Sequence, residues 1–175
     1  MAEAWMRTLP PASRFILHGD ANARAAASAA WGVGFAEAPC RAIVQGDRAT
    51  LWLGPDEYLM WQAGRNGQVE SAAAIEHALR DFPHALVDIS HRQIALEIAG
   101  RHAESILNGG CPLDLDIRSF PVGMCTRTVF AKADVVLWRT AEHTFHVEVW
   151  RSFEGYIRGL LHEIGREFSG EISLR

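Results

Sequence analysis

The sequence predicts an α+β fold made of two tandem halves, each with the element order β-α-β-β-β-α. Apolar runs of strand length and apolar stripes of helical period follow each other in the same order twice. Corresponding positions also keep a nearly constant separation: Gly19 lies 81 residues before Gly100, and Ile75 lies 85 residues before Leu160. These two observations indicate an internal structural repeat.

The first half, over about 13–83, opens with a strand followed by a helix. Phe15-Ile16-Leu17 is a short apolar run that ends at a glycine, which is typical of a strand. Asp20 stands where a helix N-cap is expected, because its carboxylate can accept hydrogen bonds from the first-turn amides. An alanine-rich stretch then continues to Trp31 and stops at Gly32, as helices commonly do.

Three strands and a second helix complete this half. Apolar runs separated by turn residues predict an antiparallel meander at 41–44, 50–53 and 58–61. From Ser71 to Phe82 the apolar residues recur at helical spacing. Pro83 ends the helix, because proline has no amide hydrogen to continue the ladder.

The second half, over about 84–168, repeats the pattern, although two strands rather than one open it. Its predicted strands are 85–89, 93–98, 126–130, 134–138 and 144–150. A short helix is predicted over 101–107 and a turn over 139–142. Ser152 is predicted to cap a final helix whose apolar side consists of Phe153, Tyr156, Ile157, Leu160, Leu161, Ile164 and Phe168. A loop from Cys111 to Gly123 follows the short helix.

A unit with helices on one face of its sheet leaves the other face or an edge to be covered. A second copy related by a pseudo-twofold axis is the simplest partner. We therefore expect residues 1–175 to form a single domain with an internal repeat.

Composition limits the classes of protein. The chain has 175 residues, 49% hydrophobic and 22% charged, with a net charge of −4, which fits a folded domain and no membrane span. The arginines are scattered, so no basic stripe is expected to bind nucleic acid. The first ten residues do not resemble a secretory signal, and three cysteines without CxxC spacing indicate free thiols. We expect a cytoplasmic protein.

Most candidate catalytic patterns fail on geometry. Asp88, Ser90 and His91 contain the residue types of a hydrolase triad, yet neighbouring residues on a strand point to opposite faces. The same argument separates His143 from His146 as metal ligands, although Glu148 could lie beside His146. A hydrolase with Ser90 as nucleophile remains the least favoured alternative.

Two further patterns have simple structural explanations. Gly32-Val33-Gly34 follows a predicted helix, whereas a dinucleotide-binding glycine motif follows a strand and opens a helix. Asp114 and Asp116 could form a carboxylate pair for acid and base catalysis. Because Arg118 lies two residues on, a locally neutralised loop is the simpler interpretation.

The loop from Cys111 to Gly123 is long and unusually apolar for a surface segment. In an extended conformation, Leu113, Leu115 and Ile117 would form one apolar side opposite Asp114 and Asp116. The loop packs either onto its own core or against another protein. Trp5 lies in an otherwise unstructured N-terminal segment, and aromatic and arginine residues are favoured interface anchors. The candidate partner-interface residues are Trp5, Arg92, Leu115, Arg118, Phe120 and Arg127.

Four stretches of sequence resemble a known family. They are Val87–Gln93, Asn108–Leu115, Phe120–Thr128 and Val136–Arg139. Each is similar to the gamma subunit of heterotetrameric sarcosine oxidase, and the similarity is densest from residue 86 to about 161. More loosely, Asp88-Ile89-Ser90 and the Val136–Arg139 strand resemble the amino-terminal part of the glycine-cleavage T-protein. The resemblance therefore implies a T-protein-like, folate-binding fold.

The resemblance implies a small, non-catalytic subunit of a complex that oxidatively demethylates sarcosine to glycine, using oxygen and tetrahydrofolate. In this family FAD, FMN, NAD and the folate site belong to the large alpha and beta subunits, and zinc belongs to the delta subunit. No catalytic, cofactor or metal residue is therefore expected in this chain, whose expected partners are the alpha, beta and delta subunits.

The main alternative is a free-standing folate-binding one-carbon protein of the T-protein type that uses Asp134. Folate-binding relatives carry a glycine pair and two adjacent acids in the hairpin before the Val136 strand. This chain has only Ala131-Lys132-Ala133-Asp134 there, which argues against an independent folate site.

Overall fold

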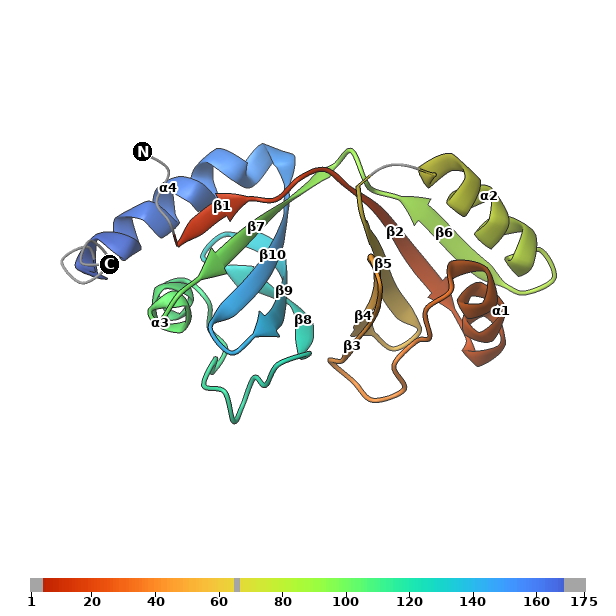
Figure 1. The fold of residues 1–175 in the computed structure, drawn as a ribbon, viewed down its shortest axis with the longest axis horizontal. Helices are drawn as coiled ribbons and strands as arrows, with labels where there is room; N and C mark the ends of the chain where they lie inside the picture. Colours follow the sequence, from red (N-terminus) through yellow and green to blue (C-terminus); the bar gives the residue numbers. More distant parts are fainter. Residues whose placement is uncertain (1–4, 65–66, 169–175) are drawn as a thin grey trace. The chain divides into compact units, whose positions relative to one another are not determined.

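The computed structural model describes residues 5–64 and 67–168, and they divide into two compact units. The amino-terminal unit consists of the described residues within 10–92 together with 123–126. The carboxy-terminal unit consists of residues 5–9, 93–122 and 127–168. Each unit contains one five-stranded antiparallel sheet, which confirms the α+β class (Figure 1).

The sheet of the amino-terminal unit has the strand order β3-β4-β5-β2-β6. Its strands are β2 (Ala12–Gly19), β3 (Ala42–Gln45), β4 (Arg48–Gly54), β5 (Glu57–Ala63) and β6 (His84–Asp88). Its helices are α1 (Ala21–Trp31) and α2 (Gln68–Leu79). The predicted strand, helix and three-stranded meander are all confirmed, whereas the second helix begins three residues earlier than predicted and ends at Leu79 rather than Phe82.

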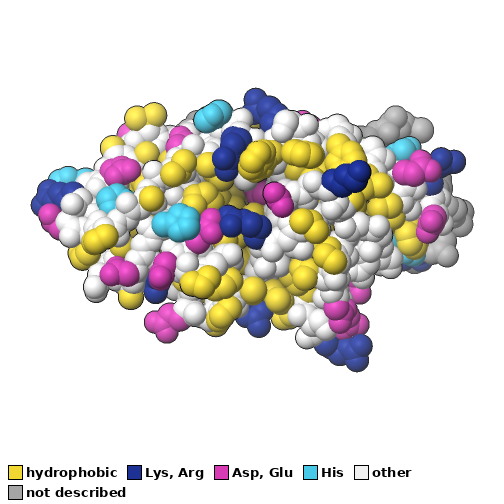
Figure 2. All heavy atoms as spheres, turned by 180° about the vertical axis from the view of Figure 1, so that it is seen from behind, with side chains coloured by type: hydrophobic (Ala, Val, Ile, Leu, Met, Phe, Trp, Pro, Cys, Tyr) yellow, Lys and Arg dark blue, Asp and Glu magenta, His cyan; other side chains and the backbone are white. Residues whose placement is uncertain are grey.

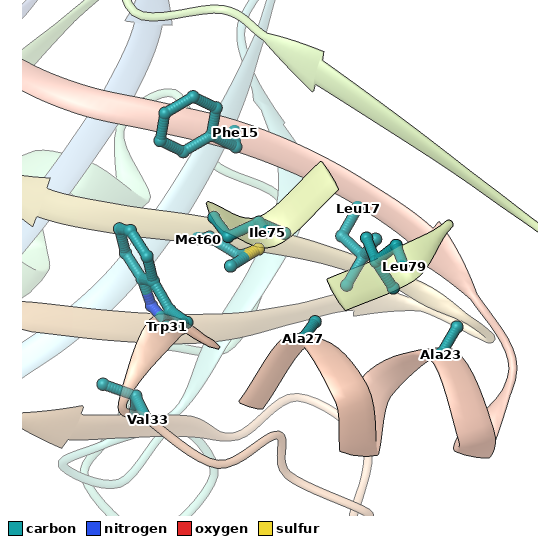
Figure 3. Packing of buried hydrophobic residues seen from close by; sticks show 9 residues of the cluster. All are labelled: Phe15, Leu17, Ala23, Ala27, Trp31, Val33, Met60, Ile75 and Leu79. Atoms are coloured by element: carbon teal, nitrogen blue, oxygen red, sulfur yellow. The ribbon is translucent and has the colours of Figure 1, made fainter. Parts of the chain in front are cut away.

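One face of this sheet packs against both helices (Figure 3). The fully buried side chains between them are Phe15, Leu17, Ala23, Ala27, Trp31, Val33, Met60, Ile75 and Leu79. The small alanines of α1 allow the helix to lie close to the strands. Both predicted ends of α1 are confirmed, because Asp20 accepts a hydrogen bond from the Ala23 amide at 2.9 Å and Gly32 adopts a left-handed φ of 80°.

The sheet of the carboxy-terminal unit has the strand order β1-β7-β10-β9-β8. Its strands are β1 (Met6–Thr8), β7 (Gln93–Ala99), β8 (Cys125–Phe130), β9 (Ala133–Ala141) and β10 (Thr144–Trp150). Its helices are α3 (Ala103–Asn108) and α4 (Glu154–Gly165), flanked by the 3-10 turns η1 (Arg151–Phe153) and η2 (Arg166–Phe168). The strands predicted at 93–98, 126–130, 134–138 and 144–150 and both predicted helices are present here, whereas the strand predicted at 85–89 is β6 of the other sheet.

The two sheets use the same order of elements. Reading from the meander, the orders are β3-β4-β5-β2-β6 and β8-β9-β10-β7-β1, so each meander lies next to the strand that precedes its first helix. The outermost strands differ from the sequence-based division. β6 pairs with β2, so residues 84–92 group with the amino-terminal unit rather than with the predicted second half. β1 was not predicted, and it pairs with β7.

Three local predictions need correction. Ser152 does not cap the last helix, because it lies inside η1 and α4 begins at Glu154 with no side-chain cap. The turn predicted over 139–142 begins later, because β9 continues to Ala141. The N-terminal segment is not unstructured where it is described, because the carbonyl of Trp5 accepts a hydrogen bond from the Ala99 amide at 2.8 Å.

Candidate partner-binding loop

Residues 109–124 connect α3 to β8, and we call residues 111–122 of this connection the α3–β8 loop. They contain neither helix nor strand, as predicted. Leu115 and Phe120 point inward and are fully buried, with 0% and 1% of their surface exposed. Ile117 and Val122 are exposed to 38% and 51%. The loop therefore has an apolar inner side and an outer side that still carries apolar surface.

A turn centred on Asp116 gives the loop this shape. The amides of Ser119 and Phe120 both donate to the Asp116 carbonyl, at 2.9 and 2.8 Å. The Asp116 carboxylate accepts from the Arg118 amide at 2.9 Å and from Arg118 Nε at 2.8 Å. Because the chain turns here, Leu115 and Ile117 lie on different sides. The extended strip with one apolar side was therefore the wrong geometry.

The two acidic residues of the loop are locally paired. The Asp114 carboxylate accepts from the Ser119 hydroxyl at 2.6 Å and from the Asp116 amide at 3.0 Å, and these bonds lower its pKa. Hydrogen bonds from the Arg118 side chain and amide lower the pKa of Asp116 to about 2. A catalytic acid or base needs a pKa near the working pH. These contacts support the interpretation as a neutralised loop and not as a catalytic pair.

Arg139 on β9 holds the inner side of the loop in place. It was not among the functional residues predicted from the sequence. Its Nη1 donates to the carbonyls of Leu115 and Phe120, both at 2.8 Å. Its Nε donates to the Glu142 carbonyl at 3.0 Å, and its Nη2 donates to the Glu104 carboxylate at 3.1 Å. Only 1% of Arg139 is exposed. A single arginine that follows the apolar run Val135–Trp138 was the available sequence signal.

Aromatic packing completes this support. The Arg139 guanidinium lies 4.7 Å from the centre of the Phe145 ring, which in turn lies 6.3 Å from the Phe120 ring. Cation–π contact with a desolvated arginine stabilises such an arrangement. The loop is therefore held in one conformation by the carboxy-terminal unit itself.

The six predicted interface residues divide into two groups. Trp5, Leu115 and Phe120 are buried within the carboxy-terminal unit, so their side chains offer little surface to a partner. Trp5 packs so closely on α4 that a Cβ added at Gly165 would lie 2.6 Å from its ring. Arg92, Arg118 and Arg127 are exposed, with Arg92 in the amino-terminal unit and the other two in the carboxy-terminal unit.

Ser90 has a structural role that explains its place beside Asp88. Its hydroxyl accepts from the Arg14 amide at 2.8 Å and donates to the Arg14 carbonyl at 3.3 Å, while its amide donates to Asp88 at 2.8 Å. Ser90 and His91 lie in the turn after β6 and not on a strand, so the strand argument for separating them needs correction; Ser90 is buried and His91 is exposed. These contacts support the exclusion of a local hydrolase triad.

The two histidines of the second half do not lie on one strand as predicted, because His143 lies in the turn before β10. His146 lies on β10 with its Nε2 2.7 Å from the Glu148 carboxylate, and both side chains are buried. His143 is exposed between β9 and β10. Within 5–64 and 67–168 no group of three His, Cys, Asp or Glu side chains could hold a metal ion. Asp134, named in the folate alternative, is exposed on β9.

Three aromatic side chains that the sequence analysis did not assign to the surface are exposed near the start of α4. Trp150, Phe153 and Tyr156 have 42%, 36% and 41% of their surface exposed, and the rings of Phe153 and Tyr156 meet edge to face at 6.4 Å. The predicted apolar side of the last helix included Phe153 and Tyr156. That part of the prediction was wrong, because Phe153 belongs to η1 and the buried stripe of α4 begins at Ile157.

The surface charge is mixed. On the face shown in Figure 2, lysine and arginine side chains are interspersed with acidic ones and do not gather into one basic stripe. In the described part of the chain, no helix combines the length and the apolar character that crossing a bilayer requires.

The fold is similar to that of a known protein. Aminomethyltransferase T of the glycine cleavage system from Bartonella henselae superimposes with a TM-score of 0.64, covering 89% of this chain and 44% of that one at 11% identity. The chain therefore shares the fold of the part of that protein on which it superimposes. The model of the sarcosine oxidase, gamma subunit family matches residues 18–167. The protein belongs to that family.

Two relatives support the assignment. Sarcosine oxidase subunit gamma from Corynebacterium sp. (strain P-1) is 37% identical over 123 residues, which is 70% of this chain and 59% of that relative. This chain thus spans less than two thirds of that relative's length. A chain of heterotetrameric sarcosine oxidase from Corynebacterium sp. U-96 superimposes with a TM-score of 0.86 at 29% identity, covering 94% of this chain and 84% of that one.

Proposed function

We propose that this chain is a non-catalytic structural subunit of a heterotetrameric sarcosine oxidase, which oxidatively demethylates sarcosine to glycine with oxygen and tetrahydrofolate. The observation that carries the proposal is the superposition, over 94% of the chain, on a chain of a heterotetrameric sarcosine oxidase. Family membership supports it. The partners are the alpha, beta and delta subunits, and the complex works in the cytoplasm.

In this proposal the cofactors lie outside the chain, with FAD, FMN, NAD and tetrahydrofolate on the large subunits and zinc on the delta subunit. The position of Gly32-Val33-Gly34 supports this division. These residues follow α1, and Gly32 serves as the C-cap of that helix. A dinucleotide would instead need a glycine turn after a strand, where the following helix directs its amides at the phosphates.

We propose that the α3–β8 loop contacts a large subunit through its outer side. Ile117, Arg118 and Val122 are exposed there, and 87% of the Arg118 side chain is accessible. A surface already held in one conformation loses little entropy on binding, so the anchoring by Arg139 favours association. Arg92 and Arg127 are further proposed contacts, whereas Trp5, Leu115 and Phe120 support the surface from within.

Co-expression with the large subunits, followed by purification on a tag attached to this chain, tests the proposal. We expect the Arg118→Ala, Ile117→Ser double variant to recover about tenfold less large subunit, because an apolar and a guanidinium contact are both removed. Its melting temperature should stay close to that of the wild type, since both side chains are exposed.

Arg166→Ala is the matched control. Arg166 is also an exposed arginine paired with a nearby carboxylate, at 3.0 Å from Glu163, but it lies beyond α4. It should recover the large subunits fully. Full recovery with the loop variant as well would reject the loop as the contact, and no recovery with the wild-type chain would reject the subunit role.

We further propose that residues 1–175 act as one domain whose halves are related by a pseudo-twofold axis. The matching strand orders of the two sheets support it. A crystal structure in which a rotation near 180° superimposes one sheet on the other would establish the relation, and a very different rotation would reject it.

A further inference from the structure

Cys40 and Cys125 lie opposite each other in the amino-terminal unit. Arg41 and Met124 form an isolated antiparallel bridge, and Cys40 and Cys125 are the next residues on its two chains. The Cys125 amide donates to the Cys40 carbonyl at 3.0 Å. This hydrogen bond holds the two backbones side by side, as in a hydrogen-bonded antiparallel pair, whose Cα atoms are about 5.5 Å apart. This separation lies inside the range of about 4.4 to 6.8 Å that a disulfide spans. Burial raises the pKa of Cys125, and the Cys40 side chain is close enough to contribute to this rise.

The backbone has positive φ angles on both sides of this pair. Cys40 has a left-handed φ of 58°, which is unusual for a side chain other than glycine, and it follows the exposed residues 37–39. On the opposite chain, Gly123 has a φ of 84°.

The two thiols differ in accessibility. Cys40 is partly exposed, whereas Cys125 is fully buried and its thiol donates to the Trp52 carbonyl at 3.6 Å. Burial raises the pKa of Cys125 to about 12. An oxidant from solvent therefore reaches Cys40 first. Cys125 is then the thiol that reacts with the oxidised Cys40 sulfur to form the disulfide. Both are free thiols in the structure.

We propose that Cys40 and Cys125 form a reversible disulfide when a small hydroperoxide oxidises the protein. The Cys40 thiolate attacks the peroxide oxygen, the O–O bond breaks, and a sulfenic acid and water or an alcohol result. The Cys125 sulfur then attacks the Cys40 sulfur, the S–S bond forms, the S–O bond breaks, and water leaves with the Cys125 proton. Two thiols lose two electrons and two protons, and one hydroperoxide is reduced. An external dithiol reverses the step.

The disulfide would tie the entry of β3 to the start of β8, closing the long chain segment between residues 40 and 125. Closing a long loop restricts the unfolded chain more than the folded one. The oxidised protein should therefore have a higher melting temperature than the reduced protein.

The test uses the full chain, reduced and then treated with hydrogen peroxide, with iodoacetamide added to trap remaining thiols. Before any alkylation, we expect the intact mass to fall by about 2 Da, the mass of two hydrogen atoms. Alkylation in denaturant should then label only Cys111 of the three cysteines. Peptide mapping should identify a Cys40–Cys125 linkage that dithiothreitol removes.

Cys111→Ser is the matched control, because Cys111 is also buried but lies in the carboxy-terminal unit near Thr128. This variant should form the linkage as the wild type does, whereas Cys40→Ser should not. In Cys125→Ser, Cys40 should still be oxidised but should form no disulfide within the chain. Cys125→Ala serves the same purpose if Cys125→Ser fails to fold. The proposal is overturned if wild-type Cys40 oxidises to sulfinic acid, or links only between chains, while Cys125 stays reduced.

Discussion

Arg139 is a buried cation that mainly backbone carbonyls surround. It donates to the carbonyls of Leu115, Phe120 and Glu142 and shares one carboxylate, that of Glu104. A buried charge is costly unless all its hydrogen-bonding positions are used. Here the guanidinium satisfies groups from a loop, a turn and a helix at once, so one side chain sets the path of the α3–β8 loop.

We expect Arg139→Met to lower the free energy of unfolding by about 3 to 5 kcal/mol. Methionine keeps most of the volume but leaves three carbonyls without their donor. Urea denaturation followed by circular dichroism measures the loss.

Arg166→Met is a suitable comparison, because it changes an exposed arginine and should have a much smaller effect. If Arg139→Met unfolded at the same urea concentration as the wild type, Arg139 would not be what holds the loop.

The sequence could show that the α3–β8 loop was too apolar for a solvated segment, but not which side chains turn inward. Phe120 and Leu115 are held inward because Arg139, which lies 19 and 24 residues away in sequence, donates hydrogen bonds to their carbonyls. Such a contact leaves no periodic pattern in the loop itself. Asp114, Asp116 and Arg118 were interpreted correctly as a neutralised group, because their pairing depends on near neighbours.

At the level of secondary structure, predictions succeeded where the determining contact is local. Asp20 and Gly32 end α1 through hydrogen bonds and backbone angles that belong to the helix ends. β1 was missed because it is only three residues long and depends on pairing with β7, far along the chain. Ser152 has a side chain that could cap a helix, but it lies within the 3-10 turn η1, and α4 begins only at Glu154.

His84 joins the end of α2 to the start of β6. Its Nδ1 lies 2.8 Å from the Phe82 carbonyl oxygen, and its Nε2 lies 3.1 Å from the Glu76 carboxylate. The Phe82 carbonyl is the main cause of a raised pKa, and Glu76 adds to it. The folded state thus favours the imidazolium, which can donate from both nitrogens.

This shift gives a pH dependence with a defined sign. The stabilisation is fully present below the unfolded pKa of 6.5 and is lost as the pH rises through the higher folded pKa. We expect His84→Gln to lower the melting temperature at a pH of about 5.5 more than at about 8.5. A thermal scan across this range measures it.

His91→Gln, which changes an exposed histidine, provides the reference for that scan. An effect of His84→Gln that is equal at both pH values would contradict the assignment.

For the whole molecule, the order of elements followed from local patterns, whereas the membership of the two sheets did not. Apolar alternation identified β6 and β7 as strands but not that they belong to different sheets. Edge pairing is decided by contacts between distant segments, and a short strand such as β6 carries no pattern that names its neighbour.

The shared fold with T-protein makes folate binding testable on the isolated chain. We expect this chain not to bind tetrahydrofolate, because residues 131–134 lack the glycine pair and the two acids of folate-binding relatives. A ligand that binds only the native state raises the melting temperature, so tetrahydrofolate should leave it unchanged. Differential scanning fluorimetry over a range of folate concentrations measures this. A saturable rise that Asp134→Ala abolished would favour the one-carbon protein alternative over the structural subunit.

The place of β1 has a consequence for the order in which the chain can fold. Residues 9–92 separate β1 from β7, and they contain every strand of the amino-terminal sheet. In that sheet β2 and β6 are antiparallel neighbours, with Phe15 opposite Asp88. Once they pair, the chain enters and leaves the sheet at nearby points, so the entropy lost in joining β1 to β7 falls to that of a short loop. During synthesis, β1 is made before all the other strands. It can pair with β7 only after the strands of the amino-terminal sheet have been synthesised.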